Sequence, residues 1–265
     1  MQTVYMLVVA GLVPGGGVDA GGYQGMSDAY WNVFSEDICW IMTVTYAIII
    51  LTYILIFVCR KKKPLEEVGI CKTQLAAAPS SFVFGVALQI AVVFVIAILS
   101  AAFPGIAEDS ASNQEVFDHM YGNASLLSQF IFMAVATPVM EEVIFRGLIY
   151  TRLKKGMPQV AAMLLSALAF GLAHSGFVQV TYATALGIIM VLMYEKYESL
   201  WPCIFLHAGF NATNFLYDYL NMNSILVQYC LMFVSAGLVL AFVAYFFVTK
   251  PVYYEDLRRD ENEII

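Results

Sequence analysis

Long apolar runs, separated by short polar segments, occupy most of this 265-residue sequence. A helix needs about 20 apolar residues to cross the hydrocarbon core of a bilayer, and seven runs approach that length. The runs cover residues 37–59, 80–103, 124–151, 157–174, 177–195, 200–217 and 223–249. This pattern predicts an all-α fold, in which about seven transmembrane helices form a polytopic bundle.

Two regions outside these runs have features of their own. Residues 1–13 are apolar but too short to cross a bilayer, so we expect a re-entrant or interfacial segment there. Residues 26–36 combine aromatic and acidic side chains, which is typical of an interfacial helix. Residues 104–123 are acidic, and we expect them to form a solvated loop between two spans.

Lysine and arginine are confined to alternate connecting segments. Twelve of the 13 follow the first, third, fifth or seventh span, and only Arg146 lies within a span. The segments 1–36, 104–123, 175–176 and 218–222 have none. By the positive-inside rule, this distribution predicts a multi-pass integral membrane protein with its N-terminus outside and its C-terminus in the cytoplasm.

Composition agrees with a lipid environment. Apolar residues make up 61% of the chain and charged residues 12%, and the mean hydropathy is +0.76. These values lie outside the usual range of soluble domains. The net charge of −7 and the scarcity of basic residues give no sign of a nucleic-acid partner, so the lipid bilayer is the expected environment. The five cysteines have no C-x-x-C spacing, and all except Cys71 fall in or beside apolar runs and are interpreted as small apolar residues.

Three stretches place ionisable or amide side chains inside these apolar runs. They are the segments 141–146, 170–174 and 207–211. A charge at membrane depth costs about 2.5–3.5 kcal/mol even on the lenient insertion scale, so such a group marks a functional site by default. Together the three stretches predict a buried polar site inside the bundle, and one with a catalytic role.

The first stretch contains two carboxylates and a guanidinium. Glu142 and Arg146 are four residues apart and share a helix face, so they can pair locally and support the site structurally. Glu141 is rotated about 100° from Glu142 around the helix and is left for chemistry. Thr137-Pro138 lies just upstream and should kink or loosen the helix near both acids.

The other two stretches contribute imidazole and amide groups. His207 and Asn211 are four residues apart, so they project from one face and could stabilise a developing oxyanion. Phe170 and His174 have the same spacing, which would let the ring pack against the imidazole and orient it. Simple core packing is the interpretation that we favour for Phe170.

This set of side chains permits two kinds of hydrolytic chemistry. In one, Glu141 assisted by His174 deprotonates a water, while His207 and Asn211 stabilise the oxyanion, with no cofactor. In the other, Glu141, His174 and His207 bind a zinc ion that activates the water. The helical zinc motif H-E-x-x-H is absent. Asparagine is a poor zinc ligand, so we expect the route without a metal.

The three motifs, in this order and on separate membrane helices, resemble the CPBP family. E-E-x-x-x-R begins at Glu141, F-x-x-x-H at Phe170 and H-x-x-x-N at His207. The family comprises the type II CAAX prenyl proteases and their bacterial Abi relatives. The resemblance covers residues from about 126 to 216, and the combination of three motifs is highly specific.

The resemblance implies an intramembrane endopeptidase that acts on a membrane-associated peptide or protein. It assigns Glu141 and His174 to water activation and His207 and Asn211 to the oxyanion site. It assigns Glu142 and Arg146 to structural support. CAAX-type C-terminal processing is one implied activity, and processing of a bacterial peptide or bacteriocin, or immunity to it, is another. A non-catalytic membrane scaffold of the same fold that binds a regulatory partner is the alternative.

The chain is accordingly divided into four parts. Residues 1–36 form an extracytoplasmic, glycine-rich and interfacial segment, and residues 37–123 form the N-terminal helices and the acidic loop. Residues 124–217 form the catalytic core, and residues 218–265 form the last helix and a cytoplasmic tail. One expectation is in tension with this scheme. At 1.5 Å per residue, Glu141 and His207 each lie about 10–15 Å from the cytoplasmic helix ends, but His174 lies about 24 Å from them.

Overall fold

The computed structural model describes residues 22–71, 77–220 and 225–249, and all of its regular elements there are helices. The α-helices are α2 (Gly22–Cys59), α3 (Pro64–Glu67), α4 (Ala77–Ala102), α5 (Pro104–Tyr121), α6 (Leu126–Phe130), α7 (Thr137–Glu142), α8 (Thr151–Gly156), α9 (Gln159–Leu172), α10 (Phe177–Tyr197), α11 (Leu200–Leu220) and α12 (Ile225–Val248). The π-helices are η1 (Ile131–Ala136) and η2 (Val143–Tyr150). The predicted all-α class is confirmed.

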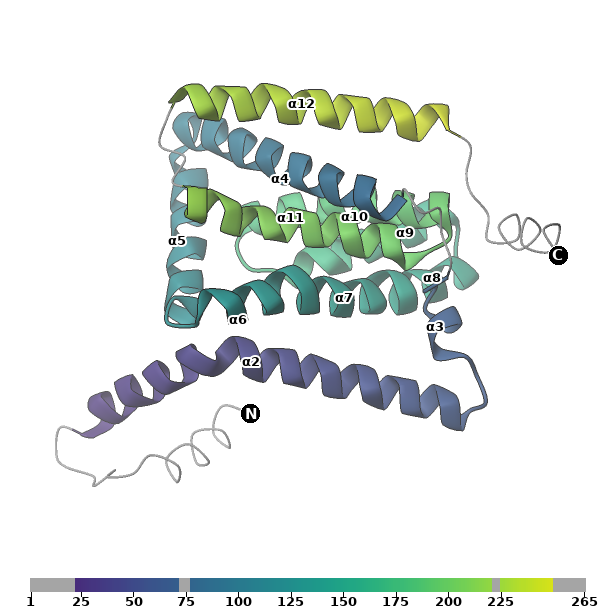
Figure 1. The fold of residues 1–265 in the computed structure, drawn as a ribbon, viewed down its shortest axis with the longest axis horizontal. Helices are drawn as coiled ribbons and strands as arrows, with labels where there is room; N and C mark the ends of the chain where they lie inside the picture. Colours follow the sequence, from purple (N-terminus) through teal and green to yellow (C-terminus); the bar gives the residue numbers. More distant parts are fainter. Residues whose placement is uncertain (1–21, 72–76, 221–224, 250–265) are drawn as a thin grey trace.

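The long helices lie side by side, with α2 at one edge of the bundle and α12 at the other (Figure 1). α5 runs across one end of the bundle, whereas α3, α8 and the ends of α2 and α12 gather at the opposite end. Apart from Arg146, the described basic residues lie in α8, after α2, before α3 or in the last turn of α10. They are Arg60, Lys61, Lys62, Lys63, Arg152, Lys154, Lys155 and Lys196. The predicted segregation of basic residues therefore corresponds to one end of the fold.

Five helices within the described residues are long and apolar enough to cross a membrane. They are Ser35–Cys59, Ala77–Ala102, Leu126–Gly156, Phe177–Tyr197 and Val227–Val248. The other two predicted spans are also helices but fall outside this group. α9 has only 14 residues, and α11 contains His207, Asn211 and Asn214 among its apolar side chains. The chain is thus a multi-pass, helical membrane protein, and α9 and α11 lie between its outer helices α2 and α12 (Figure 1).

Two expectations about the outer segments are wrong. Residues 104–123 are not a loop, because α5 occupies Pro104–Tyr121. Its sequence has a proline at the first turn and polar pairs four residues apart, such as Gln114 and Asp118, and both features favour a helix. Residues 26–36 are not a separate interfacial helix, since they continue into the span as part of the 38-residue α2. The segment expected at 1–13 lies outside the described residues.

Glycines bring α4 and α11 into close contact. A Cβ atom at Gly85 would lie 1.9 Å from the carbonyl oxygen of Leu206, and one at Gly209 would lie 2.2 Å from that of Phe82. Small residues at helix crossings let backbones approach in this way, which is how membrane helices gain packing energy. The contact fixes α11 against α4 on both sides of His207, so the position of that imidazole depends on it.

The segment after α3 anchors the start of α11. The backbone N–H of Leu200 donates to the carbonyl of Gly69 at 2.8 Å, and the hydroxyl of Ser199 donates to that of Cys71, also at 2.8 Å. Gly69 has a φ of +81°, a conformation that glycine adopts without strain. Leu200 is fully buried at this contact, whereas the next residue, Trp201, is 40% exposed.

Lys196 has a different role from the one expected for a residue in a connecting segment. It lies in the last turn of α10 and is only 6% exposed. Its ammonium group donates to the carbonyls of Phe246 and Thr249 and to the Thr249 hydroxyl at 2.6 Å. These are orphan acceptors at the end of α12, so Lys196 caps that helix and attaches it to the bundle.

Candidate active site

The third apolar run folds as one continuous helix of alternating α and π segments. The π-helices η1 and η2 flank α7, which contains Glu141 and Glu142. A π turn is wider than an α turn, and π turns inside α-helices are frequent at functional sites. The loosening predicted at Thr137-Pro138 is therefore present, as π turns immediately before the proline.

Asn211 supplies the hydrogen bond that Pro138 cannot make. The N–H of Thr137 donates to the carbonyl of Phe132, five residues earlier. In the same register, the N–H of residue 138 would donate to the carbonyl of Met133, but proline has no N–H. The Nδ2 atom of Asn211 donates to that carbonyl at 2.9 Å. The amide thus holds α11 to the π segment, and one of its donors is committed to this bond.

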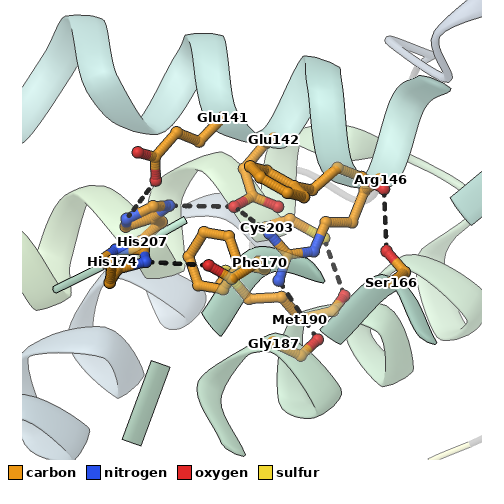
Figure 2. A network of polar contacts seen from close by, with 11 residues as sticks. Glu141, Glu142, Arg146, Ser166, Phe170, His174, Gly187, Met190, Cys203 and His207 are labelled. Carbon is orange, nitrogen blue, oxygen red and sulfur yellow. Dashed lines mark hydrogen bonds and ion pairs between the residues drawn. The ribbon is translucent and has the colours of Figure 1, made fainter. Parts of the chain in front are cut away.

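Glu142 lies at the centre of the buried polar site (Figure 2). Its Oε1 atom accepts a hydrogen bond from Nη1 of Arg146 at 2.8 Å and lies 3.0 Å from Nδ1 of His207. Glu142 and Arg146 are fully buried, and His207 is 3% exposed. A carboxylate paired with an arginine can only accept hydrogen bonds, so Nδ1 of His207 bears a proton. The pair expected from the spacing of Glu142 and Arg146 is present.

The ring of Phe170 contacts the guanidinium of Arg146 and both imidazoles of the site. The guanidinium carbon of Arg146 lies 4.4 Å from the centroid of its ring, a favourable cation–π geometry. The rings of His174 and His207 meet it edge to face, with centroid distances of 4.9 and 5.7 Å. Phe170 is 1% exposed. It is therefore a core residue, as expected, and one that also orients both imidazoles.

Glu141 extends from the same helix toward His207 and is the less buried of the two acids. Its side chain is 20% exposed, and its Oε2 atom lies 3.7 Å from Nε2 of His207. That distance is too long for a hydrogen bond. Oε2 is itself buried and has no hydrogen-bond partner among the described residues. The site therefore presents a free carboxylate oxygen beside an imidazole nitrogen.

His174 follows the end of α9 and is partly exposed. Its Nδ1 atom lies 2.9 Å from the carbonyl oxygen of Phe170. A carbonyl can only accept, so Nδ1 carries the proton and Nε2 has the lone pair in the neutral ring. This tautomer leaves Nε2 able to accept a proton from a bound molecule. The structure places Glu141 beside His207, and His174 and His207 both pack against the ring of Phe170.

The discrepancy in depth between Glu141 and His174 has a structural explanation. The third helix does not end near residue 151 but continues through α8 to Gly156. Glu141 therefore lies 15 residues, or about 22 Å, from that end, close to the value of about 24 Å expected for His174. The depth expected for Glu141 is too small because the helix extends five residues beyond the predicted span, which ends at residue 151.

Two of the three candidate zinc ligands face each other in the site. Glu141 and His207 direct one oxygen and one nitrogen toward each other, as two ligands of one ion would. A structural or catalytic zinc site needs at least three protein ligands. No group of three His, Cys, Asp or Glu side chains within the described residues is placed to bind a metal ion. The third candidate, His174, does not join this pair, so the residues do not fit a zinc ion in this arrangement.

Several residues that support the site were not identified from the sequence. The hydroxyl of Ser166 donates to the carbonyl of Phe145 at 3.0 Å, within η2. Nη2 of Arg146 donates to the carbonyl of Gly187 at 3.3 Å, and the thiol of Cys203 donates to that of Met190 at 3.2 Å. Ser166 could have been suspected as a polar residue in an apolar helix. The two carbonyl partners have no sequence signal, because any residue supplies a carbonyl.

The part of the chain that contains this site matches a known protein family. Residues 123–213 match the family model described as "Type II CAAX prenyl endopeptidase Rce1-like". The match contains all three motifs and covers about a third of the chain. The resemblance to the CPBP family that the motifs indicate is confirmed for this region.

A curated relative agrees with the family match. The chain is 27% identical over 108 residues to the "Putative membrane peptidase YdiL" of Bacillus subtilis (strain 168). That alignment covers 41% of this chain and 43% of the relative, so the chain spans less than half of the relative's length. No solved structure matches the chain.

The bond between Asn211 and Met133 generates a prediction that separates structure from chemistry. Asn211→Ala leaves a buried carbonyl without a partner, and we expect a loss of about 1–3 kcal/mol in the free energy of unfolding. Pro138→Ala restores a backbone N–H in the right register. The double variant should therefore recover most of that stability, as measured by equilibrium unfolding in mixed micelles.

The same pair of variants tests the oxyanion role expected for Asn211. If the amide also binds the oxyanion, the double variant stays slower than wild type by about 10²–10³-fold although its stability has returned. Full recovery of activity together with stability would mean that Asn211 acts only on the helix. A double variant as unstable as Asn211→Ala would contradict the π-register explanation.

Proposed function

We propose that this protein is an intramembrane endopeptidase that hydrolyses a peptide bond in a membrane-associated protein or peptide. The observation that supports it most strongly is the free Oε2 atom of Glu141, 3.7 Å from Nε2 of His207 in a buried network. An unpartnered buried carboxylate oxygen is costly in a structure, and such groups occur where a bound molecule completes them. The family match supports the same class of reaction.

Water is the molecule that fits this gap. A hydrogen bond needs about 2.8 Å, so one water can contact both Oε2 of Glu141 and Nε2 of His207 across their separation. In the proposed reaction, Glu141 accepts a proton from this water as its oxygen bonds to the substrate carbonyl carbon. The carbonyl π electrons move to the oxygen, and a tetrahedral oxyanion forms.

The charges of the site favour His207 as the donor to that oxyanion. The carboxylates of Glu141 and Glu142 carry two negative charges, and the guanidinium of Arg146 carries one positive charge. A doubly protonated His207 would supply the second positive charge and make the site neutral. Its Nδ1–H is already committed to Glu142, so only an imidazolium offers a second N–H, at Nε2. We propose that this imidazolium stabilises the oxyanion, and that Asn211 contributes its remaining amide N–H.

Collapse of the intermediate needs a proton for the leaving amine. The carbon–nitrogen bond breaks as the oxyanion re-forms a carbonyl, and the amine must leave in neutral form. Glu141 holds the proton taken from water and can return it, since general acid and base roles alternate in such reactions. Nε2 of His174 has a free lone pair in this tautomer. It can therefore accept the second proton of the attacking water, or relay the proton held by Glu141 to the amine.

The substrate and orientation follow from the same proposal. A site between membrane helices accepts segments that already lie at the membrane, so CAAX-type C-termini, prenylated or not, and bacterial peptides such as bacteriocins are the candidates. We propose that the basic end of the bundle is cytoplasmic. A fluorescent-protein fusion to the C-terminus should then fluoresce, and an alkaline phosphatase fusion should be inactive. The reverse result would overturn the orientation.

The catalytic assignment predicts a loss of cleavage without a loss of folding. Glu141→Gln, His174→Ala and His207→Ala should each reduce hydrolysis of a quenched fluorescent farnesylated CAAX peptide by at least about 10²–10⁴-fold. Each variant should still purify as a folded protein in detergent. His119→Ala is the matched control, because this third histidine is exposed on α5 and far along the chain from the site.

Wild-type rates from any of the three site variants would remove that residue from the mechanism. If Glu141→Gln keeps the biological function of the wild type while the peptide is never cleaved, the protein is a membrane scaffold of this fold. Retained binding of the farnesylated peptide with no cleavage by wild type would point to the same conclusion.

The proposed chemistry needs no metal, which predicts the behaviour of metal-depleted protein. After exhaustive chelation, cleavage should continue at an unchanged rate, and elemental analysis should find well under one zinc per chain. Stoichiometric zinc whose removal stops turnover, with recovery when zinc is added back, would contradict this. Glu141, His174 and His207 would then have to move together as its ligands.

A further inference from the structure

The acidic helix α5 contacts the bundle at the turn that follows His174. It runs across the end of the bundle opposite the basic residues (Figure 1) and packs against α2, α4 and α10. The carboxylate of Asp109 accepts a hydrogen bond from the N–H of Phe177 at Oδ1 and from that of Val178 at Oδ2, each 2.9 Å long. These are two of the four orphan donors at the start of α10, so Asp109 from another helix caps it.

A second residue of α5 holds the other side of the turn. Asn113 lies four residues after Asp109, donates to its Oδ2 at 3.3 Å and accepts from the hydroxyl of Ser175 at 3.4 Å. Gly176 has a φ of +75°, and a Cβ atom there would lie 2.0 Å from Nδ2 of Asn113. The turn is therefore pressed against α5 at a position where only glycine fits.

The turn between α9 and α10 sets the position of His174. α9 ends at Leu172, and the backbone N–H of His174 makes a last bond to the carbonyl of Gly171 at 3.0 Å. Beyond this point the chain is held by its contacts with α5 until α10 begins at Phe177. Within the described residues the imidazole makes one hydrogen bond, at Nδ1, and packs against the Phe170 ring, so the direction of Nε2 also depends on where the backbone of His174 lies.

We propose that Asp109 is a positioning residue of the active site, which fixes the turn after His174 by capping α10 and thereby aims Nε2 of His174. It lies outside the region that matches the family model, which begins at residue 123. The proposal rests on the hydrolytic role proposed for His174. Asp109 touches no reacting atom in it and acts through the 174–178 backbone.

Three variants on α5 test this role by kinetics. Asp109→Ala should lower kcat by about 10²-fold with KM nearly unchanged, because a misplacement of about 1 Å costs that much in rate. Asp109→Asn should recover most of the loss, since asparagine caps helices almost as well as aspartate. Asp118→Ala is the matched control, an acid of the same helix whose carboxylate accepts from Gln114. The substrate is the quenched farnesylated CAAX peptide.

A measurement independent of turnover separates this proposal from the proposed function. In ¹⁵N-histidine-labelled protein, Asp109→Ala should shift or broaden the ring resonances of His174 and leave those of His207 in place. If the His174 resonances shift in Asp109→Ala but wild-type protein cleaves no peptide, the endopeptidase proposal is contradicted. The positioning role of Asp109 is then still supported. If Asp109→Ala does not fold, Asn113→Ala, which removes the contact of α5 with Ser175 on the same turn, replaces it and should shift the His174 resonances in the same way. Unchanged His174 resonances, or a kcat no lower than that of Asp118→Ala, would overturn the positioning role.

Discussion

The arrangement of this site depends on one buried carboxylate. Glu142 is fully buried and accepts from Arg146 and His207 through the same oxygen atom. An isolated ionised carboxylate in such a place would cost many kcal/mol, so the ion pair with Arg146 is a condition of the fold. Because Glu142 fixes the proton on Nδ1 of His207, it also directs Nε2 of that ring toward Glu141.

The backbone of the third helix is adapted to this network. Glu141 and Glu142 are adjacent in sequence but need different surroundings, one partly open and one dry. The π segments on either side of α7 widen the helix there, and partners from other helices satisfy carbonyls within them. Asn211 binds the carbonyl of Met133 and Ser166 that of Phe145. The acids are thus held by contacts that reach across the bundle.

The sequence predicted those parts of the site that depend on the type and spacing of side chains. Ionisable groups in apolar runs identified the site residues, and spacing identified the pair of Glu142 and Arg146. It was less informative where a contact uses the backbone of another helix. The bond from Asn211 to Met133 and the cap that Lys196 provides for α12 involve carbonyls that every residue has. The helix α5 was overlooked because its acidic composition was given more weight than its N-terminal proline and its i,i+4 polar pairs.

The most direct test of this account is the protonation of His207 in ¹⁵N-histidine-labelled protein in micelles. The chain has only three histidines, so single substitutions assign every ring signal. The account predicts a proton on Nδ1 of His207 in wild type at neutral pH, and a changed ring signal when Glu142→Gln removes the negative charge. A His207 ring with an unprotonated Nδ1, or one that does not respond to Glu142→Gln, would contradict it.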